Sequence, residues 1–164
     1  MDILERLNYL EKSEAFSKWK KENPEFFLSH IFVMFDNLNK DIIQCGYYSP
    51  KIDRIITFVV QDGEIVKSGE SEVFRHPDKN VKEFERDKIK ISLDQAYKIM
   101  EDFQKKEYPN QSAVKSFVII QNIDEGMVYN FTYMTPTFYT LNVKVSCETG
   151  EVVSHLLHSL IKGM

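Results

Sequence analysis

The sequence predicts an α+β fold of two tandem duplicated units that share one core, each a helix followed by antiparallel β-strands. Two features repeat along the chain and support this prediction. The blocks Lys20–Pro24 and Lys105–Pro109 both read Lys-Lys-Glu-X-Pro, and a Gly-Glu turn follows each, at Gly63 and Gly150. The two prolines lie 85 positions apart (109 − 24) and the two glycines 87 apart (150 − 63). The spacing grows by two residues, as expected if insertions fall in loops.

The first unit is predicted to open with a helix over Asp2–Lys21. Asp2 and Glu5 form a capping-box pattern, apolar residues recur on one face, and Pro24 ends the helix. The strands predicted after it are Phe27–Asp36, Ile42–Tyr48, Arg54–Gln61 and Glu64–Val66, with a turn over 36–40 and a continuation of the last strand through Phe74. The nearly continuous apolar run of the first strand predicts that both of its faces are covered.

The second unit opens with a clearer helix signal. Ser92 and Gln95 form a capping box, Ile91 occupies the staple position before it, and the helix is predicted to end at Tyr108-Pro109. The strands predicted next are Val114–Gln121, Val128–Met134, Thr140–Cys147 and Glu151–Leu157.

The organisation predicted from these elements is a first unit over 1–76, a polar connecting segment over 77–90 and a second unit over 91–164. One helix covers one face of a small sheet. Two units bury more apolar surface if their sheets join edge to edge or pack face to face. The sequence does not decide between these two arrangements.

The second unit resembles the PepSY domain family. The matching stretches are Ile91–Ala96 at the helix start, Tyr108-Pro109 at the break and Cys147–Val153 at the closing turn. The resemblance covers about Ile91 to Leu157, with a weaker echo in the first unit, and Ser146-Cys147 departs from the usual Val-Asp. It implies a helix with a strand meander of cystatin-like character. It also implies an inhibitory or interaction module without catalytic residues.

Composition and charge bear on partners and location. The net charge of −4 argues against nucleic acid or an anionic membrane as a partner. The acidic start Met1–Glu5 lacks the basic region of a signal peptide, and no stretch reaches the roughly 20 apolar residues of a membrane helix. These features predict a cytoplasmic protein. Cys45 and Cys147 are then expected to stay reduced and buried, with a disulfide between them as the alternative.

The sequence shows no catalytic pattern, and we predict no cofactor, no metal and no enzymatic activity. Neither cysteine has the helix-start setting of a reactive thiol, and phosphate-binding glycine motifs are absent. His155 and His158 are the nearest approach to a metal pair, but on a strand their odd separation directs them to opposite faces.

Aromatic residues in two matching hairpins form the candidate binding site. They are Tyr47, Tyr48, Tyr133, Phe138 and Tyr139. Large apolar side chains at hairpin tips can mark a binding surface, although they can also pack against the other unit. We therefore expect a non-enzymatic binding or regulatory module that contacts a protein or peptide. The alternative is a small-molecule binder or enzyme with an aromatic-lined pocket between the units. A further hypothesis is that exposed edge strands pair two chains into a homodimer.

Overall fold

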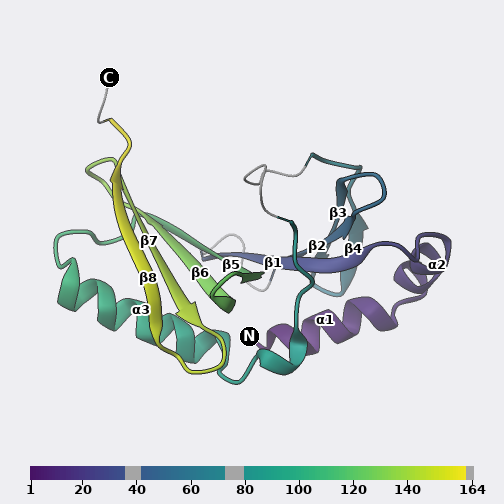
Figure 1. Ribbon diagram of the computed structural model, residues 1–164, viewed down its shortest axis with the longest axis horizontal. Helices are drawn as coiled ribbons and strands as arrows, with labels where there is room; N and C mark the ends of the chain where they lie inside the picture. The colour runs from purple at the N-terminus through teal and green to yellow at the C-terminus, as the bar shows by residue number, and fades with distance from the viewer. Residues whose placement is uncertain (36–41, 73–79, 162–164) are drawn as a thin grey trace.

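The computed structural model describes residues 1–35, 42–72 and 80–161, and within them it contains three α-helices and one eight-stranded antiparallel sheet. The fold is therefore α+β, as predicted (Figure 1). The helices are α1 (Ile3–Lys12), α2 (Glu14–Glu22) and α3 (Leu93–Glu107). The strands are β1 (Phe27–Phe35), β2 (Ile43–Ser49), β3 (Arg54–Gln61), β4 (Glu64–Lys67), β5 (Lys115–Ile123), β6 (Gly126–Met134), β7 (Tyr139–Ser146) and β8 (Val152–Ser159). The predicted turn over 36–40 and the continuation to Phe74 lie outside the described residues.

The sheet is two four-stranded meanders joined at one strand pair. Its order is β4-β3-β2-β1-β5-β6-β7-β8, so β1 and β5 bring the N-terminal half (α1 to β4) and the C-terminal half (α3 to β8) together edge to edge. In this antiparallel pair Ile31 lies opposite Ile120, and Val33 lies opposite Val118. The face-to-face arrangement that the sequence left open is thereby excluded.

All three helices lie on one face of the sheet (Figure 1). Ile31 and Val33 of β1 point to this helix-covered side and are buried, whereas Phe32 and Met34 point to the other side and are only half-buried. The prediction that both faces of the first strand are covered is therefore wrong for the described helices and strands. Because the halves join edge to edge, neither sheet covers the other.

The first predicted helix is in fact two. Ser13 adopts an extended backbone conformation between α1 and α2. Its hydroxyl donates to the Leu10 carbonyl at 2.6 Å and accepts from the Phe16 amide at 3.2 Å, so one side chain closes α1 and caps α2. The break lets the shorter α2 turn so that Phe16 and Trp19 are buried.

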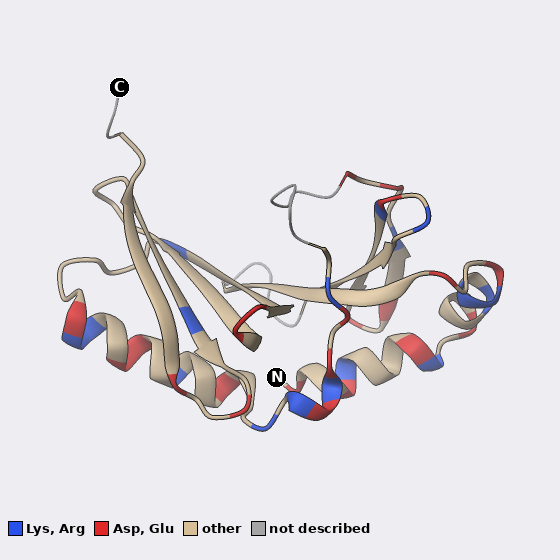
Figure 2. Ribbon diagram, viewed as in Figure 1, with Lys and Arg blue, Asp and Glu red and all other residues tan. Residues whose placement is uncertain are grey.

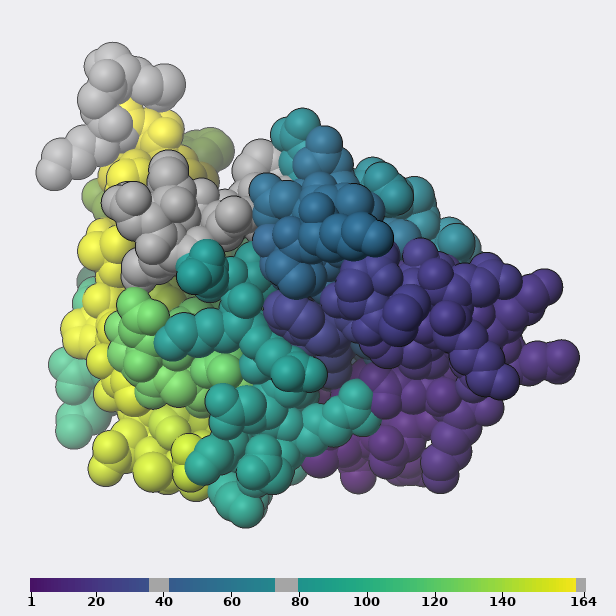
Figure 3. Space-filling model, turned by 45° about the vertical axis from the view of Figure 1, so that its right-hand side comes forward, coloured from purple at the N-terminus to yellow at the C-terminus, as the bar shows by residue number. Residues whose placement is uncertain are grey.

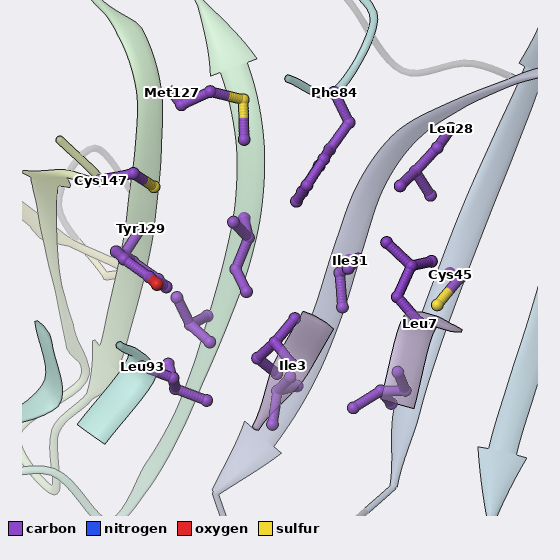
Figure 4. Packing of buried hydrophobic residues seen from close by; sticks show 14 of the residues in the cluster. Ile3, Leu7, Leu28, Ile31, Cys45, Phe84, Leu93, Met127, Tyr129 and Cys147 are labelled. Carbon is purple, nitrogen blue, oxygen red and sulfur yellow. The ribbon is translucent and has the colours of Figure 1, made fainter. Parts of the chain in front are cut away.

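The buried side of the sheet carries one hydrophobic core that includes residues from both halves. In the N-terminal half Phe16 and Trp19 of α2 pack against Tyr47 of β2 and Phe58 of β3, with ring centroids 5.0–5.8 Å apart. Figure 4 shows how the core continues across the junction, where Ile31 of β1 lies among residues of both halves. The tilted and edge-to-face contacts among the aromatic rings stabilise the core beyond the burial of their apolar surface.

Residues 80–92, part of the connection between the halves, lie along their junction, as the teal atoms between the purple and yellow-green parts of Figure 3 show. The Phe84 amide donates to the Leu28 carbonyl at 2.8 Å, and the Phe84 side chain is buried in the core (Figure 4). Arg86 forms an ion pair with Glu11 of α1, and Glu11 also accepts a hydrogen bond from the Tyr47 hydroxyl at 2.7 Å. The stretch of the connection around Phe84 and Arg86 is thus part of the packed structure.

Replacing Ser13 by alanine tests the double cap between the two helices. Ser13→Ala removes both hydroxyl hydrogen bonds, and we expect the free energy of unfolding to fall by about 1 kcal/mol. Chemical denaturation followed by far-ultraviolet circular dichroism measures this. The control is Ser17→Ala inside α2, where alanine suits a helix interior and stability should change by less than about 0.5 kcal/mol. Equal effects of the two substitutions would contradict the capping role.

Candidate functional site

The sheet face opposite the helices is the candidate functional site, and we call it the helix-free face. Side chains directly opposite each other on paired strands share a face, so the register defines its members. Its central residues are Gln44 on β2, Phe32 and Met34 on β1, Phe117 and Ile119 on β5, Asn130 and Thr132 on β6, and Asn142 and Lys144 on β7. The rings of Phe32 and Phe117 lie 5.4 Å apart across the junction of the halves and form its apolar centre.

The strands that form this face carry almost no charge. Strands β1, β2, β6 and β8 contain no Asp, Glu, Lys or Arg, although 28% of the whole chain is charged. Figure 2 shows the charged residues gathered on the helices and connecting segments, whereas the strands are almost uniformly tan. At the centre of the face the charged side chain is Lys144. Charged residues mostly lie at exposed positions of a soluble protein, so their near absence from these strands sets this face apart.

A polar network holds Lys144 in place beside the apolar centre. The Asn142 amide nitrogen donates to Asn130 Oδ1 at 2.6 Å and to Thr132 Oγ1 at 3.2 Å. This fixes the orientation of the amide, whose Oδ1 then accepts from Lys144 Nζ at 3.2 Å. Within the described residues no acidic side chain forms an ion pair with Lys144. The lysine therefore presents a positioned cation that has donors left for an incoming acceptor.

His30 forms a second polar feature of the helix-free face. The Ser29 hydroxyl donates to the Gly46 carbonyl at 3.1 Å and lies 2.8 Å from His30 Nδ1. With the hydroxyl hydrogen on the Gly46 carbonyl, Nδ1 of the neutral ring donates to Ser29 Oγ and Nε2 carries no hydrogen; the other tautomer reverses the Ser29–His30 bond. Burial lowers the pKa of His30 below 6.5, so the ring is neutral at pH 7.

The structure moves most of the predicted aromatic site into the interior. Tyr47, Tyr48 and Tyr133 are 2%, 6% and 4% exposed, so the expectation that they lie at hairpin tips is wrong. Tyr47 and Tyr48 lie inside β2, and Tyr133 lies inside β6, instead of in the connecting turns. Alternation then turns Tyr47 and Tyr133 toward the helices, and Tyr48 is covered by Phe27 at a ring distance of 5.7 Å. The alternative, packing against the other unit, also fails for Tyr47, whose ring contacts lie within its own half.

The two remaining predicted residues lie nearer the surface. Phe138 is 61% exposed and has a φ of +64°, a left-handed conformation that bulky residues rarely adopt. Tyr139 is half-buried, and its amide donates to Thr135 Oγ1 at 3.1 Å. Phe138 is therefore the predicted site residue whose side chain is open to contact.

The two histidines of β8 point to opposite faces, as their spacing predicted. His155 lies on the helix side, where its Nδ1 is 2.7 Å from the Tyr108 hydroxyl and its ring is 5.0 Å from that of Phe103. His158 lies opposite Thr140 on the helix-free side. In the part of the chain that the structure describes, no group of three or more His, Cys, Asp and Glu side chains could hold a metal ion.

The cysteines are buried free thiols, as predicted. Burial, with the nearby Glu11 carboxylate, raises the pKa of Cys45 to about 12, and burial raises that of Cys147 to about 12. Both are therefore protonated at pH 7 and unsuited to nucleophilic attack.

A hollow of about 340 Å³ lies between the N-terminal ends of α1 and α3, where the alternative hypothesis expects an aromatic-lined pocket. Its lining includes one aromatic residue, Tyr129, whose hydroxyl donates to the Ile91 carbonyl at 2.6 Å. The remaining lining is made of Met1–Leu4, Ile89 and Ser92–Asp94. The hollow is thus open and mainly aliphatic, unlike the enclosed apolar sites that bind small molecules.

Comparison with known proteins gives a fold likeness. No family model matches the sequence, and no curated protein sequence matches it. A crystal structure of a protein named as a "putative lipoprotein" from Clostridium difficile 630 is similar to this chain, with a TM-score of 0.58 at 11% identity. The match covers 88% of this chain and 91% of that chain. At this identity the likeness shows the fold alone.

Neither the comparison nor the described residues indicate catalytic activity. None of the described helices is both long enough and apolar enough to cross a membrane. The helix-free face was missed at the sequence level because the first strand was expected to be covered on both sides. The signal that could have found it is the absence of charge from β1, β2, β6 and β8.

Replacing Gly46 by alanine tests the close packing of His30 on the helix-free face. A Cβ at Gly46 would lie 2.1 Å from His30 Cε1, so Gly46→Ala must displace the ring and should lower the free energy of unfolding by about 1–3 kcal/mol. Gly69→Ala is the matched control, because nothing lies within 4 Å of a Cβ there. Chemical denaturation measures the free energy of unfolding of both variants and of the wild-type protein. A Gly46→Ala protein as stable as wild type would contradict the packing described.

The lowered pKa of His30 predicts a pH-dependent stability. As the pH falls below about 6.5, the unfolded chain binds a proton that the buried ring resists, so the free energy of unfolding should fall by up to about 1.4 kcal/mol per pH unit. The residues beside His30 on the neighbouring strands, Gly46 and Gln121, do not titrate. His30→Gln should reduce this slope in denaturation series at several pH values. The same slope in the wild-type protein and His30→Gln would contradict the assignment of this pH dependence to His30.

Proposed function

We propose that the protein is a non-enzymatic binding module that contacts a protein or peptide through the helix-free face of its sheet. The observation that carries this proposal is the composition of that face. The face has a half-buried apolar centre around Phe32 and Phe117 on strands that carry almost no charge. Beside this centre lies Lys144, whose ammonium group is hydrogen-bonded to Asn142. Depletion of charge with aromatic residues at the centre is typical of interface cores.

The shape of the face favours a macromolecular partner over a small molecule. The face extends over strands of both halves, whereas the hollow between α1 and α3 lies on the opposite, helix-covered side. Interfaces concentrate their binding energy in a few central apolar and aromatic residues surrounded by polar groups. Phe32 and Phe117 supply such a centre, with Asn130, Thr132 and Lys144 at its side.

Lys144 indicates part of the partner's chemistry. Its ammonium group is held by Asn142 and forms no ion pair with a described acidic residue. A partner carboxylate or carbonyl beside an apolar anchor would satisfy this cation while burying the ring pair. We therefore propose a partner surface that combines an apolar side chain with an acidic group.

We further propose that the two halves are copies of one ancestral unit similar to PepSY domains, with the boundaries 1–76 and 91–164. Matching positions support the proposal. The residues that end α2 and α3 have nearly equal backbone angles, with φ −133° and ψ 59° at Asn23, and φ −136° and ψ 60° at Tyr108. Gly63 and Gly150 follow the third strand of each half with φ of +80° and +79°. The cytoplasmic location predicted from the N-terminal sequence also stays a prediction.

A binding experiment with matched variants tests the proposed surface. Immobilised wild-type protein, Phe117→Gln and Lys144→Met are exposed to lysate of the source cells, and retained proteins are purified and titrated individually. Loss of an interface anchor should weaken the binding of a true partner about tenfold or more. The control is Ile52→Gln, which changes an exposed apolar residue (43% exposed) in the turn between β2 and β3 and should bind as wild type does.

Methyl chemical-shift mapping of the purified complex then locates the contact, because the backbone amides of these central strands are already bonded within the sheet. The methyl groups of Met34, Ile119 and Thr132 on the helix-free face should shift on binding, and denaturation curves show that the variants remain folded. A partner that binds all four proteins equally, or that shifts methyl groups of the helices instead of those of this face, would contradict the proposal.

A further inference from the structure

The two edges of the sheet differ in how well they are protected. Edge strand β4 has four residues, including Glu64 and Lys67, and the chain after it returns to pair Ser71 with Ile55. Edge strand β8 has eight residues and contains no charged residue, proline or glycine. Soluble proteins normally shield such edges with charges, prolines or short strands, because an open edge is a template for another strand. Strand β8 lacks each of these devices.

The backbone of β8 is oriented to accept another strand. The Leu160 amide donates to the Phe138 carbonyl at 2.8 Å, so Leu160 directs its backbone groups toward β7. Because these directions alternate in an antiparallel pair, the odd-numbered residues His155, Leu157 and Ser159 direct their N–H and C=O groups away from β7. Among the described residues no strand pairs with this outer edge.

Exposed apolar side chains gather at the same place. Large exposed apolar residues on and beside β8 are Phe138, Val153, Leu156, Leu160 and Ile161. Leu156 is 64% exposed and lies on the helix-free face opposite Asn142, and the exposed Phe138 and Leu160 lie at the end of the β7–β8 pair. A concentration of apolar surface along an open edge marks a contact site.

We propose that β8 pairs antiparallel with β8 of a second copy of this chain, forming a two-fold symmetric dimer with one continuous sheet. A self-pairing strand must be compatible with itself, and β8 brings no like charges together. With Leu157 on the symmetry axis, all three outward-facing residues pair, and Leu156 lies beside the partner's His158. The pairing has the same form as the β1–β5 junction inside the chain.

The protected second edge limits the assembly to two copies. After β8 is paired, the outer strand at each end of the combined sheet is β4, which is short and carries charges. Isologous pairing of the single open edge therefore closes at a dimer instead of extending into a fibre. One strand pair is smaller than a standard interface of roughly 1,600 Å², so the dimer should dissociate on dilution. This inference does not depend on the proposed binding partner.

Sedimentation velocity over a wide concentration range tests the dimer. The wild-type protein should pass from monomer to dimer as its concentration rises, without larger species. Leu156→Lys places two lysines near the symmetry axis and should raise the dimer dissociation constant about tenfold or more. Val66→Lys is the matched control, because Val66 is 59% exposed on the other edge strand and should leave the dimer unchanged. Circular dichroism and thermal unfolding check that both variants fold.

A disulfide tests the register independently. Antiparallel residues on the symmetry axis have Cα atoms close enough for a disulfide. Oxidised Leu157→Cys should therefore form a covalent dimer, whereas Val66→Cys should not; Cys45 and Cys147 are buried. A wild-type protein that stays monomeric at every concentration would overturn the proposal. Equal dimerisation of wild type and Leu156→Lys, or loss of the dimer in Val66→Lys, would also overturn it.

Discussion

The antiparallel pairing of β1 with β5 is the interaction on which the rest of the structure depends. It converts two four-stranded meanders into one sheet and aligns the helix-covered side of each half with that of the other. Val33 and Val118 face each other at this junction and are almost completely buried. Without the pair, each half would expose an unpaired strand edge, β1 or β5, and one open flank of its core. The shared core is therefore a consequence of this junction.

The same junction explains why none of the described helices covers this face of the sheet. Joining edge to edge puts all three helices on one side, so half-buried apolar residues such as Phe32 and Phe117 remain on the other. The chain separates its chemistry accordingly, with charges on helices and loops and few on the strands. The helices give the protein its charged exterior, and the sheet retains a face and an edge that charge does not protect.

Much of the fold could be predicted from local signals. The capping box at Ser92 and Gln95 forms as expected, and β3 has the predicted bounds Arg54–Gln61. The break at Ser13 was missed because apolar residues continue on both sides of it, and a serine that both ends and starts a helix resembles a surface position.

The candidate site was harder to predict, because it depends on how the two halves meet. The sequence left edge-to-edge and face-to-face packing open, and that choice decides whether Phe32 is covered. The aromatic residues show the same dependence at smaller scale. Tyr47 of β2 packs against Phe16 of α2 and is buried, whereas Phe138 lies between β6 and β7 and is exposed. Pairing register and strand length are tertiary properties, and local patterns do not determine them.

Native-state hydrogen exchange of the backbone amides tests the central role of the β1–β5 junction most directly. If this pair unites the halves into one core, amides of β1 and β5 should exchange only through global unfolding, with the highest free energy of opening in the protein. The core strands β2 and β6, one from each half, should approach the same value. Amides of β1 and β5 that exchange more easily than β2 and β6 would show that the halves separate before they unfold, and would contradict this account.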